Sequence, residues 1–229
     1  MESYQEVQIS ANDITSFTDS YEQNKQRIEN EQSEFESKSS LVEILASLLS
    51  LRDQIQNNNT SKSVIQIPNL VKSLITLSTF RTGTHLREEI DLQRIQIRHW
   101  SRECLSQIQV HGDAYVQSEL VRQGYGRVMS ILYCKAGGKG EEQDYEIYNG
   151  LINISIFLRE QHDGRNYDYS SFQPLPLLAR TSLEQIEDEG ANEEIETQMK
   201  NNGYNGFIKA WAIITKEVIL NHFIHKLRR

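Results

Sequence analysis

Four arginines recur along the middle of the chain at spacings that place them on one face of a helix. At about 100° per residue they fall within one narrow arc, about a third of a turn from a neighbouring apolar stripe. These four residues are Arg87, Arg94, Arg98 and Arg102. The planar guanidinium group suits phosphate oxygens, and Arg122 and Arg127 follow nearby. We call the six residues the arginine ridge, and it predicts a surface that holds a sugar-phosphate backbone without reading bases.

The same helix carries acidic residues that offer a second explanation of the ridge. Asp91 lies in the arc, and Glu88 and Glu103 flank it. Pairs three or four residues apart on a helix form ion pairs readily. A solvated or protein-facing surface therefore remains open beside the phosphate-binding one.

Two other segments contain residue types found at nucleotide or metal sites. The glycine-rich residues 137–140 include Lys139, but they lack the spacing and the hydroxyl of a phosphate-binding loop, and two glutamates follow. His222 and His225 lie one helical turn apart without an evident third ligand. We therefore expect no cofactor and no metal.

The residues that perform nucleophilic or acid-base catalysis are present but not arranged for it. Cys104 and Cys134 are the only thiols, and neither is followed by a recognisable nucleophile turn. Carboxylates abound in residues 184–196, where an acidic helix is usually a solvated face. We therefore expect that the protein is not an enzyme. A small helical enzyme stays open as a third hypothesis, after the two that are given at the end of this section.

Composition indicates the fold that must position these residues. Of the 229 residues, 38% are hydrophobic and 24% charged, as in ordinary globular proteins, and only three are proline. Helical spacing of apolar residues recurs along the chain. The sequence predicts an all-α protein, a multi-helix bundle with a polar, acidic N-terminal helical arm.

Charge is distributed in blocks of alternating sign. Residues 1–60 contain 4 basic and 11 acidic groups, and residues 61–140 contain 11 and 6. Residues 141–199 contain 3 basic and 14 acidic groups, and residues 200–229 contain 6 and 1. Such blocks neutralise each other within one molecule or attract another copy, and a basic block also suits phosphate.

The N-terminal arm, residues 1–38, carries an apolar residue at every seventh position. This spacing keeps one seam of a helix turned toward a neighbour. The seam consists of Ile14, Tyr21, Ile28, Phe35, Val42 and Leu49. Asp13 is expected to cap the arm helix, and Ser40 with Glu43 resembles a capping box that begins a second helix. The arm is expected to dock into a groove through Ile14, Phe17, Tyr21, Ile28 and Phe35.

The remaining residues, 39–229, are predicted to form one α-helical domain with a hinge at 136–143. Asp113 is expected to cap a helix, Gly190 to interrupt an acidic helix from 182 to 199, and 161–180 to form a long loop. The last helix, which begins at Phe207, is apolar on nearly all sides and is expected in the middle of the bundle. Other helices are expected over 41–56, 68–80, 84–110 and 145–160.

These observations favour a non-enzymatic protein-interaction or self-assembly protein of structural or scaffold type, acting through its N-terminal arm. The expected partner is another protein or a second copy, so a homo-oligomer is predicted. The alternative is a nucleic-acid packaging protein of coat or nucleocapsid type that binds single-stranded RNA non-specifically. Neither a signal peptide nor a membrane-spanning segment is evident, so an intracellular, cytoplasmic protein is expected.

Overall fold

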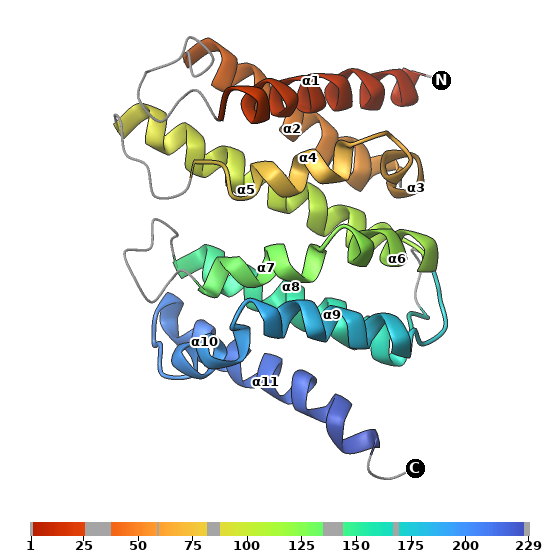
Figure 1. Ribbon diagram of the computed structural model, residues 1–229, viewed down its shortest axis with the longest axis vertical. Helices are drawn as coiled ribbons and strands as arrows, with labels where there is room; N and C mark the ends of the chain where they lie inside the picture. The colour runs from red at the N-terminus through yellow and green to blue at the C-terminus, as the bar shows by residue number, and fades with distance from the viewer. Residues whose placement is uncertain are drawn as a thin grey trace. The chain divides into compact units, whose positions relative to one another are not determined.

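The computed structural model describes residues 2–25, 38–58, 60–81, 88–134, 144–166 and 170–226, and these residues are almost entirely helical (Figure 1). The all-α prediction is confirmed, and the described residues contain no strand beyond one isolated bridge between Arg165 and Phe172. Contacts divide the chain into two compact units, Met1–Gly112 and Asp113–Arg229. The arm boundary at residue 38 lies inside the first unit, and the expected hinge at 136–143 lies outside the described residues.

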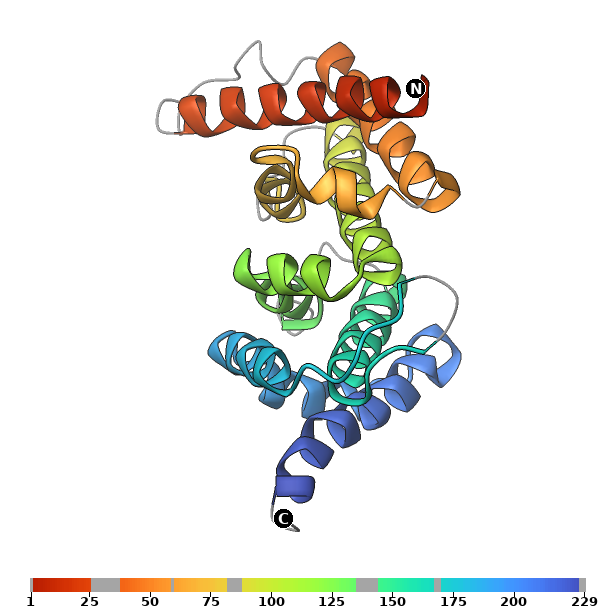
Figure 2. The ribbon, with the colours of Figure 1, turned by 90° about the vertical axis from the view of Figure 1, so that its right-hand side faces the viewer.

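The described residues of the first unit form five helices. Their bounds are α1 Glu2–Lys25, α2 Lys38–Asn58, α3 Ser61–Ile65, α4 Leu70–Leu77 and α5 Glu88–His111. Helix α2 packs along α5, α4 packs on α5, and α1 lies across α2 and α4 (Figure 2). Residues 68–80, which were expected to form one helix, instead contain α4 preceded by a turn in which Asn69 has φ of 61°.

The core of the first unit lies between α2 and α5. The buried residues of α2 alternate at spacings of three and four, and they are Leu41, Ile44, Leu48, Leu51 and Ile55. This α2 stripe packs against α5, whose residues Ile97, Leu105 and Ile108 are also buried. This stripe differs by one position from the expected seam, because Val42 is exposed and Leu49 only half-buried. The seven-residue pattern therefore does not continue in phase from α1 into α2.

The second unit contains the remaining helices. Their bounds are α6 Ala114–Arg122, α7 Tyr125–Cys134, α8 Asp144–Asp163, α9 Pro176–Asp188, α10 Ala191–Gln198, the 3₁₀ turn η2 Tyr204–Gly206 and α11 Phe207–Lys226. Asp113 caps α6 as expected, since its carboxylate accepts hydrogen bonds from the backbone N–H groups of Tyr115 and Val116. Gly190, with φ of 70°, separates α9 from α10.

Helix α8 is the centre of the second unit, with α7, α9 and α11 packed around it. The Tyr125 ring meets Phe157 edge to face at 4.8 Å, and both side chains are fully buried. At the start of α8, the Asp144 carboxylate accepts a hydrogen bond of 3.1 Å from the Tyr204 N–H. A Cβ at Gly203 would collide with that carboxylate, so a larger residue at position 203 would require the Asp144 side chain to move.

Two expectations for the second unit were wrong. Helix α9 begins at Pro176, inside the segment 161–180 that was expected to be a loop, because proline fits the first turn of a helix. Helix α11 is not in the middle of the bundle: it packs on α8 and α10 and exposes Phe207 and Leu220.

The turn between α8 and α9 contains a buried ion pair. The Arg165 guanidinium donates to the Glu160 carboxylate, and it lies 5.0 Å from the centre of the Phe172 ring. Arg165 is 1% exposed and Glu160 7%. A buried carboxylate needs its cation, because burial without one costs several kcal/mol.

We predict that Arg165→Met lowers the free energy of unfolding by about 3 kcal/mol, since it leaves the Glu160 carboxylate buried without its cation. Urea denaturation followed by the fluorescence of Trp211, in a Trp100→Phe background, measures the second unit alone. The pair Glu160→Leu with Arg165→Met should recover much of the loss. An unchanged urea midpoint for Arg165→Met would contradict this account.

Candidate docking interface of the N-terminal helix

Helix α1 contacts the rest of the first unit through one stripe of side chains. The stripe consists of residues spaced alternately four and three apart: Val7, Ala11, Ile14, Thr18 and Tyr21. All five are buried, while Gln5, Ile9, Asn12, Asp19 and Gln23 on the remaining surface of α1 are exposed. This buried side of α1 packs against α2 and α4, and we call the surface of these two helices that α1 covers the α2–α4 groove.

An aromatic contact marks the end of the groove nearest to Tyr21. The ring of Phe80, which follows α4 and is fully buried, lies 4.9 Å from the Tyr21 ring and 5.8 Å from the Phe17 ring. The Arg81 guanidinium lies 5.3 Å from the centre of the Tyr21 ring. Three of the five expected docking residues, Ile14, Phe17 and Tyr21, are thus at this interface, whereas Ile28 and Phe35 lie outside the described residues.

Polar contacts fix the position of α1 along α2. The Ser10 hydroxyl donates to that of Ser50 at 3.1 Å, and the Gln54 amide donates to the Glu6 carboxylate at 2.5 Å. Asp13, which was expected to cap the arm helix, instead lies inside α1. A one-turn shift of α1 would break these contacts, so the groove specifies a register as well as a face.

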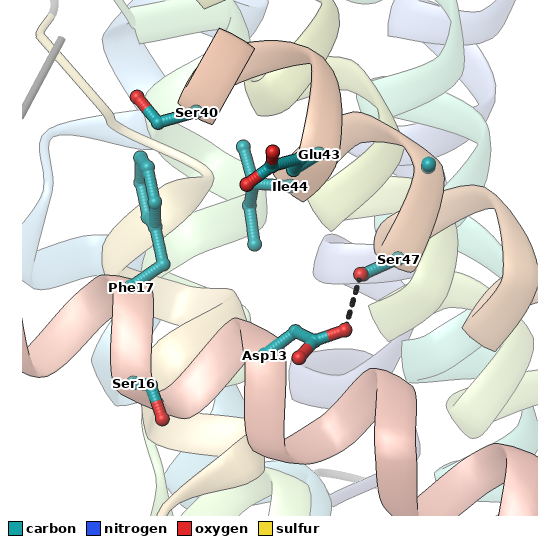
Figure 3. A pocket seen from close by; sticks show the side chains of 8 residues that line it. Asp13, Ser16, Phe17, Ser40, Glu43, Ile44 and Ser47 are labelled. Carbon is teal, nitrogen blue, oxygen red and sulfur yellow. Dashed lines mark hydrogen bonds between the residues drawn. The ribbon is translucent and has the colours of Figure 1, made fainter. Parts of the chain in front are cut away.

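A cavity of about 470 Å³ opens between α1 and α2 beside these contacts (Figure 3). Figure 3 shows the Phe17 ring and Ile44 on the apolar side, and the Ser47 hydroxyl donating to the Asp13 carboxylate at 2.9 Å. The carboxylate of Glu43 lies on the same rim. The lining offers acceptors and an apolar wall, which suits a protein side chain better than a phosphate.

The central arginines of the ridge lie inside the first unit rather than on its surface. Arg94, Arg98 and Arg102 are 2%, 1% and 5% exposed. Arg98 donates to the Phe80 carbonyl at 3.1 Å, and Arg102 donates through Nε and Nη2 to the Ser78 carbonyl at 3.2 and 2.9 Å. Carbonyls after the last turn of a helix lack helical partners and carry partial negative charge, so cations stabilise them. Arg98 and Arg102 thus bind backbone carbonyls that follow α4, whereas the sequence had suggested that they bind phosphate.

The remaining ridge residues lie in the second unit or outside the described residues. Arg122 and Arg127 belong to the second unit and are exposed, while Arg87 lies outside the described residues. Arg122 donates to Glu119, and this contact holds the pKa of the Glu119 carboxyl below its ordinary value. Arg127 pairs with Glu189 at 2.9 Å and Asp188 at 3.4 Å. Protein carboxylates thus already face both cations.

Cys104 is not suited to nucleophilic catalysis. Its thiol is fully buried between α5 and α2, 3.3 Å from the Leu48 carbonyl that accepts its hydrogen bond. Burial raises the pKa of this thiol far above the physiological range, and the nearby Glu103 carboxylate adds to the effect. The thiol is therefore neutral, whereas a nucleophilic cysteine needs the thiolate.

Two further searches bear on function. Within the described ranges, no three His, Cys, Asp or Glu residues gather as ligands of a metal ion. None of the helices in the described part of the chain combines the length and the apolar character that crossing a bilayer requires. The side chains of His222 and His225 lie outside the description.

Comparison of the chain with models of protein families, with curated proteins and with solved structures finds no match in any of the three. A function is therefore inferred from the residues of the chain itself.

Sequence reasoning missed the partners that complete the docking interface. Phe80 was recognised only as the end of a helix. Val7 extends the seven-residue seam by one step toward the N-terminus but was not included in it, and Ala11 lies off the seam. The spacing of Val7, Ala11, Ile14, Thr18 and Tyr21 is the signal that would have found the stripe, because steps of four and three keep these residues on one face of the helix.

We predict that Arg102→Met lowers the free energy of unfolding of the first unit by about 2 kcal/mol, because the buried Ser78 carbonyl loses both of its guanidinium donors. Methionine retains the apolar stem, so packing changes little. Urea denaturation monitored by Trp100 fluorescence in a Trp211→Phe background tests this. Arg122→Met, an exposed arginine of the same ridge, is the control and should leave that midpoint unchanged; equal effects would rule out a special role for Arg102.

Proposed function

We propose that this protein is a non-enzymatic, self-assembling helical protein in which α1 of one copy docks into the α2–α4 groove of another. The observation that carries the proposal is the single docking stripe of α1, joined to its groove only through residues 26–37. The same contacts therefore serve equally well within one chain or between two. Exchange of an identical element between copies is a common and inexpensive route to oligomers.

The length of the connection supports exchange. Twelve residues separate α1 from α2, and a chain of that length spans at most about 40 Å when extended. That reach allows α1 to leave its own groove and enter a neighbouring one. Exchange in pairs gives a closed dimer, whereas exchange in sequence gives an open polymer.

The energetics of docking favour the state in which α1 occupies a groove, either in its own chain or in another copy. A 24-residue polar helix is marginal in water by itself, because most helical stability in proteins comes from packing of the apolar face. An empty groove would expose Phe80 and the parts of α2 and α4 that α1 covers to water. Separation would expose both the apolar stripe of α1 and the groove to water, so the undocked state is unfavourable. The balance between internal and exchanged docking then depends mainly on protein concentration.

Charge favours one orientation of α1 in either arrangement. Its exposed surface is acidic, and the Glu22 carboxylate lies 3.8 Å from the Lys72 ammonium of α4. Thr76 of α4 also donates to Glu22, at 3.5 Å. Exposed pairs contribute little to affinity, but they guide the approach of a partner and disfavour the reversed orientation.

The nucleic-acid packaging hypothesis has weaker support. Arg94, Arg98 and Arg102 are buried within the first unit, and the exposed Arg122 and Arg127 face carboxylates. A phosphate strand would have to displace these partners before it gained a contact. Light scattering and ultraviolet absorbance, measured with and without nuclease treatment, test this alternative. If nuclease changes neither the mass of the oligomer nor its ultraviolet absorbance ratio, the protein assembles without nucleic acid.

Exchange of α1 predicts a specific disulfide between two copies. Since the hydroxyls of Ser10 and Ser50 are 3.1 Å apart, cysteines at these positions should form a disulfide after small adjustments. Ser10→Cys and Ser50→Cys, each in a Cys134→Ser background, are mixed in urea, refolded together and oxidised. Electrophoresis without reductant should show a covalent dimer whose yield rises with protein concentration.

The controls separate exchange from random collision. Replacing the Ser50→Cys partner with Ser118→Cys, an exposed serine on α6, should give little covalent dimer. The double variant Ser10→Cys, Ser50→Cys should give mostly an intrachain disulfide when dilute. If the double variant cross-links internally while the mixed single variants yield no dimer at any concentration, α1 remains in its own chain and the proposal fails.

A further inference from the structure

The cavity between α1 and α2 has the size of a binding site. Its volume, about 470 Å³, is within the range of about 300–1,000 Å³ in which proteins bind small ligands. Side chains of both helices line it, among them Asp13 and Phe17 of α1 and Glu43, Ile44 and Ser47 of α2. The cavity therefore exists only while α1 is docked.

The polar groups of the lining accept hydrogen bonds and carry negative charge. Asp13 extends from α1 and Glu43 from α2, so carboxylates of two different helices border the same space (Figure 3). The Ser47 hydroxyl donates to one oxygen of Asp13, and the other oxygen accepts no hydrogen bond from the described residues. The lining side chains include no cation and no amide. These groups suit a positively charged donor of hydrogen bonds.

The carboxylates at the cavity differ from the others along the same interface. Glu6 accepts a hydrogen bond from the Gln54 amide, and Glu22 lies 3.8 Å from the Lys72 ammonium. Glu43, by contrast, has neither a hydrogen bond nor an ion pair among the residues that the structure describes. Carboxylates that border one space repel each other, and a cation between them removes that repulsion.

The helix that carries Glu43 also leaves its carboxylate available to a ligand. The sequence suggested that Ser40 and Glu43 form a capping box at the start of a helix. Helix α2 already begins at Lys38, so both residues lie inside it and Glu43 is not at the third helical position that a capping box requires. Its side chain lies instead at the rim of the cavity (Figure 3).

An aromatic ring and an aliphatic side chain form the apolar side of the cavity. Phe17 and Ile44 lie there together (Figure 3). The Phe17 ring packs against the buried Phe80 ring at 5.8 Å, which fixes its position. Aromatic rings attract cations, and a guanidinium group stacks on them. The occupant therefore combines a positive charge with an apolar stem, which a hydrated metal ion lacks.

We propose that this cavity binds an arginine side chain of a partner protein. The methylene stem lies along Phe17 and Ile44, and the guanidinium group donates to Asp13 and Glu43. Arginine is favoured over lysine because its five N–H donors point in several directions from one plane and so serve carboxylates on two helices, whereas an ammonium group is a compact point charge. Arginine is also enriched at protein interfaces.

The site forms whether α1 occupies its own groove or that of another copy, so the proposal does not depend on exchange. It adds a role to the contact between α1 and α2. A ligand that needs both helices stabilises the docked state, because it binds that state alone. The partner's arginine therefore holds α1 in its groove.

A titration with Nα-acetyl-arginine amide, followed by the backbone amide resonances of the full chain, tests the site directly. The resonances of Asp13, Phe17 and Glu43 should shift and saturate with a Kd on the order of millimolar, as expected for one exposed ion-paired side chain. The citrulline analogue, which has nearly the same shape without the charge, should bind at least about tenfold more weakly. The lysine analogue should also bind more weakly. Equal binding of the citrulline analogue, tighter binding of the lysine analogue, or no saturable shift overturns the proposal.

Substitutions that remove one charge and retain the shape identify the carboxylates. Asp13→Asn and Glu43→Gln should each weaken binding of the arginine compound about fivefold. Asp19→Asn removes an exposed carboxylate of α1 that does not line the cavity, so this matched control should bind normally. An equal loss in Asp19→Asn would show a general attraction to the acidic helix and would overturn the site.

Stability supplies an independent readout. Because the arginine compound binds only docked α1, it should raise the urea midpoint of the first unit, measured by Trp100 fluorescence in the Trp211→Phe background. The midpoint of the second unit, measured by Trp211 in the Trp100→Phe background at the same ionic strength, should not change. An equal rise of both midpoints is a general effect of the additive and contradicts binding at this cavity.

Discussion

The first unit depends on guanidinium groups that reach from α5 to the backbone just after α4. Arg98 donates to the Phe80 carbonyl and Arg102 to the Ser78 carbonyl, both beyond the last turn of α4. That interaction fixes Phe80, whose ring forms one end of the groove that Tyr21 and Phe17 occupy. Arg98 and Arg102 thus influence the position of the N-terminal helix indirectly, through Phe80. The sequence alone suggested that these charges lie on the surface.

Local features could be predicted from the sequence because local physics decides them. Asp113 caps α6 since its carboxylate reaches N–H groups two and three residues on, and Gly190 ends α9 since it adopts a positive φ. The amphipathic arm with Ile14 and Tyr21 inward follows from spacing alone. These features need no knowledge of distant partners.

Features that depend on the neighbours of a helix could not be predicted in the same way. The arc of Arg94, Arg98 and Arg102 was recognised, but spacing cannot distinguish a solvated arc from one that faces backbone carbonyls. Helix α11 shows the converse case, since its all-round apolar pattern predicted burial on every side, whereas Phe207 and Leu220 are exposed among the described residues. In both cases the missing information is tertiary.

The turn before α11 has a consequence for how this sequence can change over generations. Gly203 leaves no space for a methyl group because the Asp144 carboxylate fills it while accepting the Tyr204 N–H. Residues 144 and 203 therefore form a coupled pair despite their separation in the chain. A larger residue at 203 would have to displace the Asp144 carboxylate from its hydrogen bond to Tyr204, so substitutions at the two positions are expected to depend on each other among descendants of this sequence.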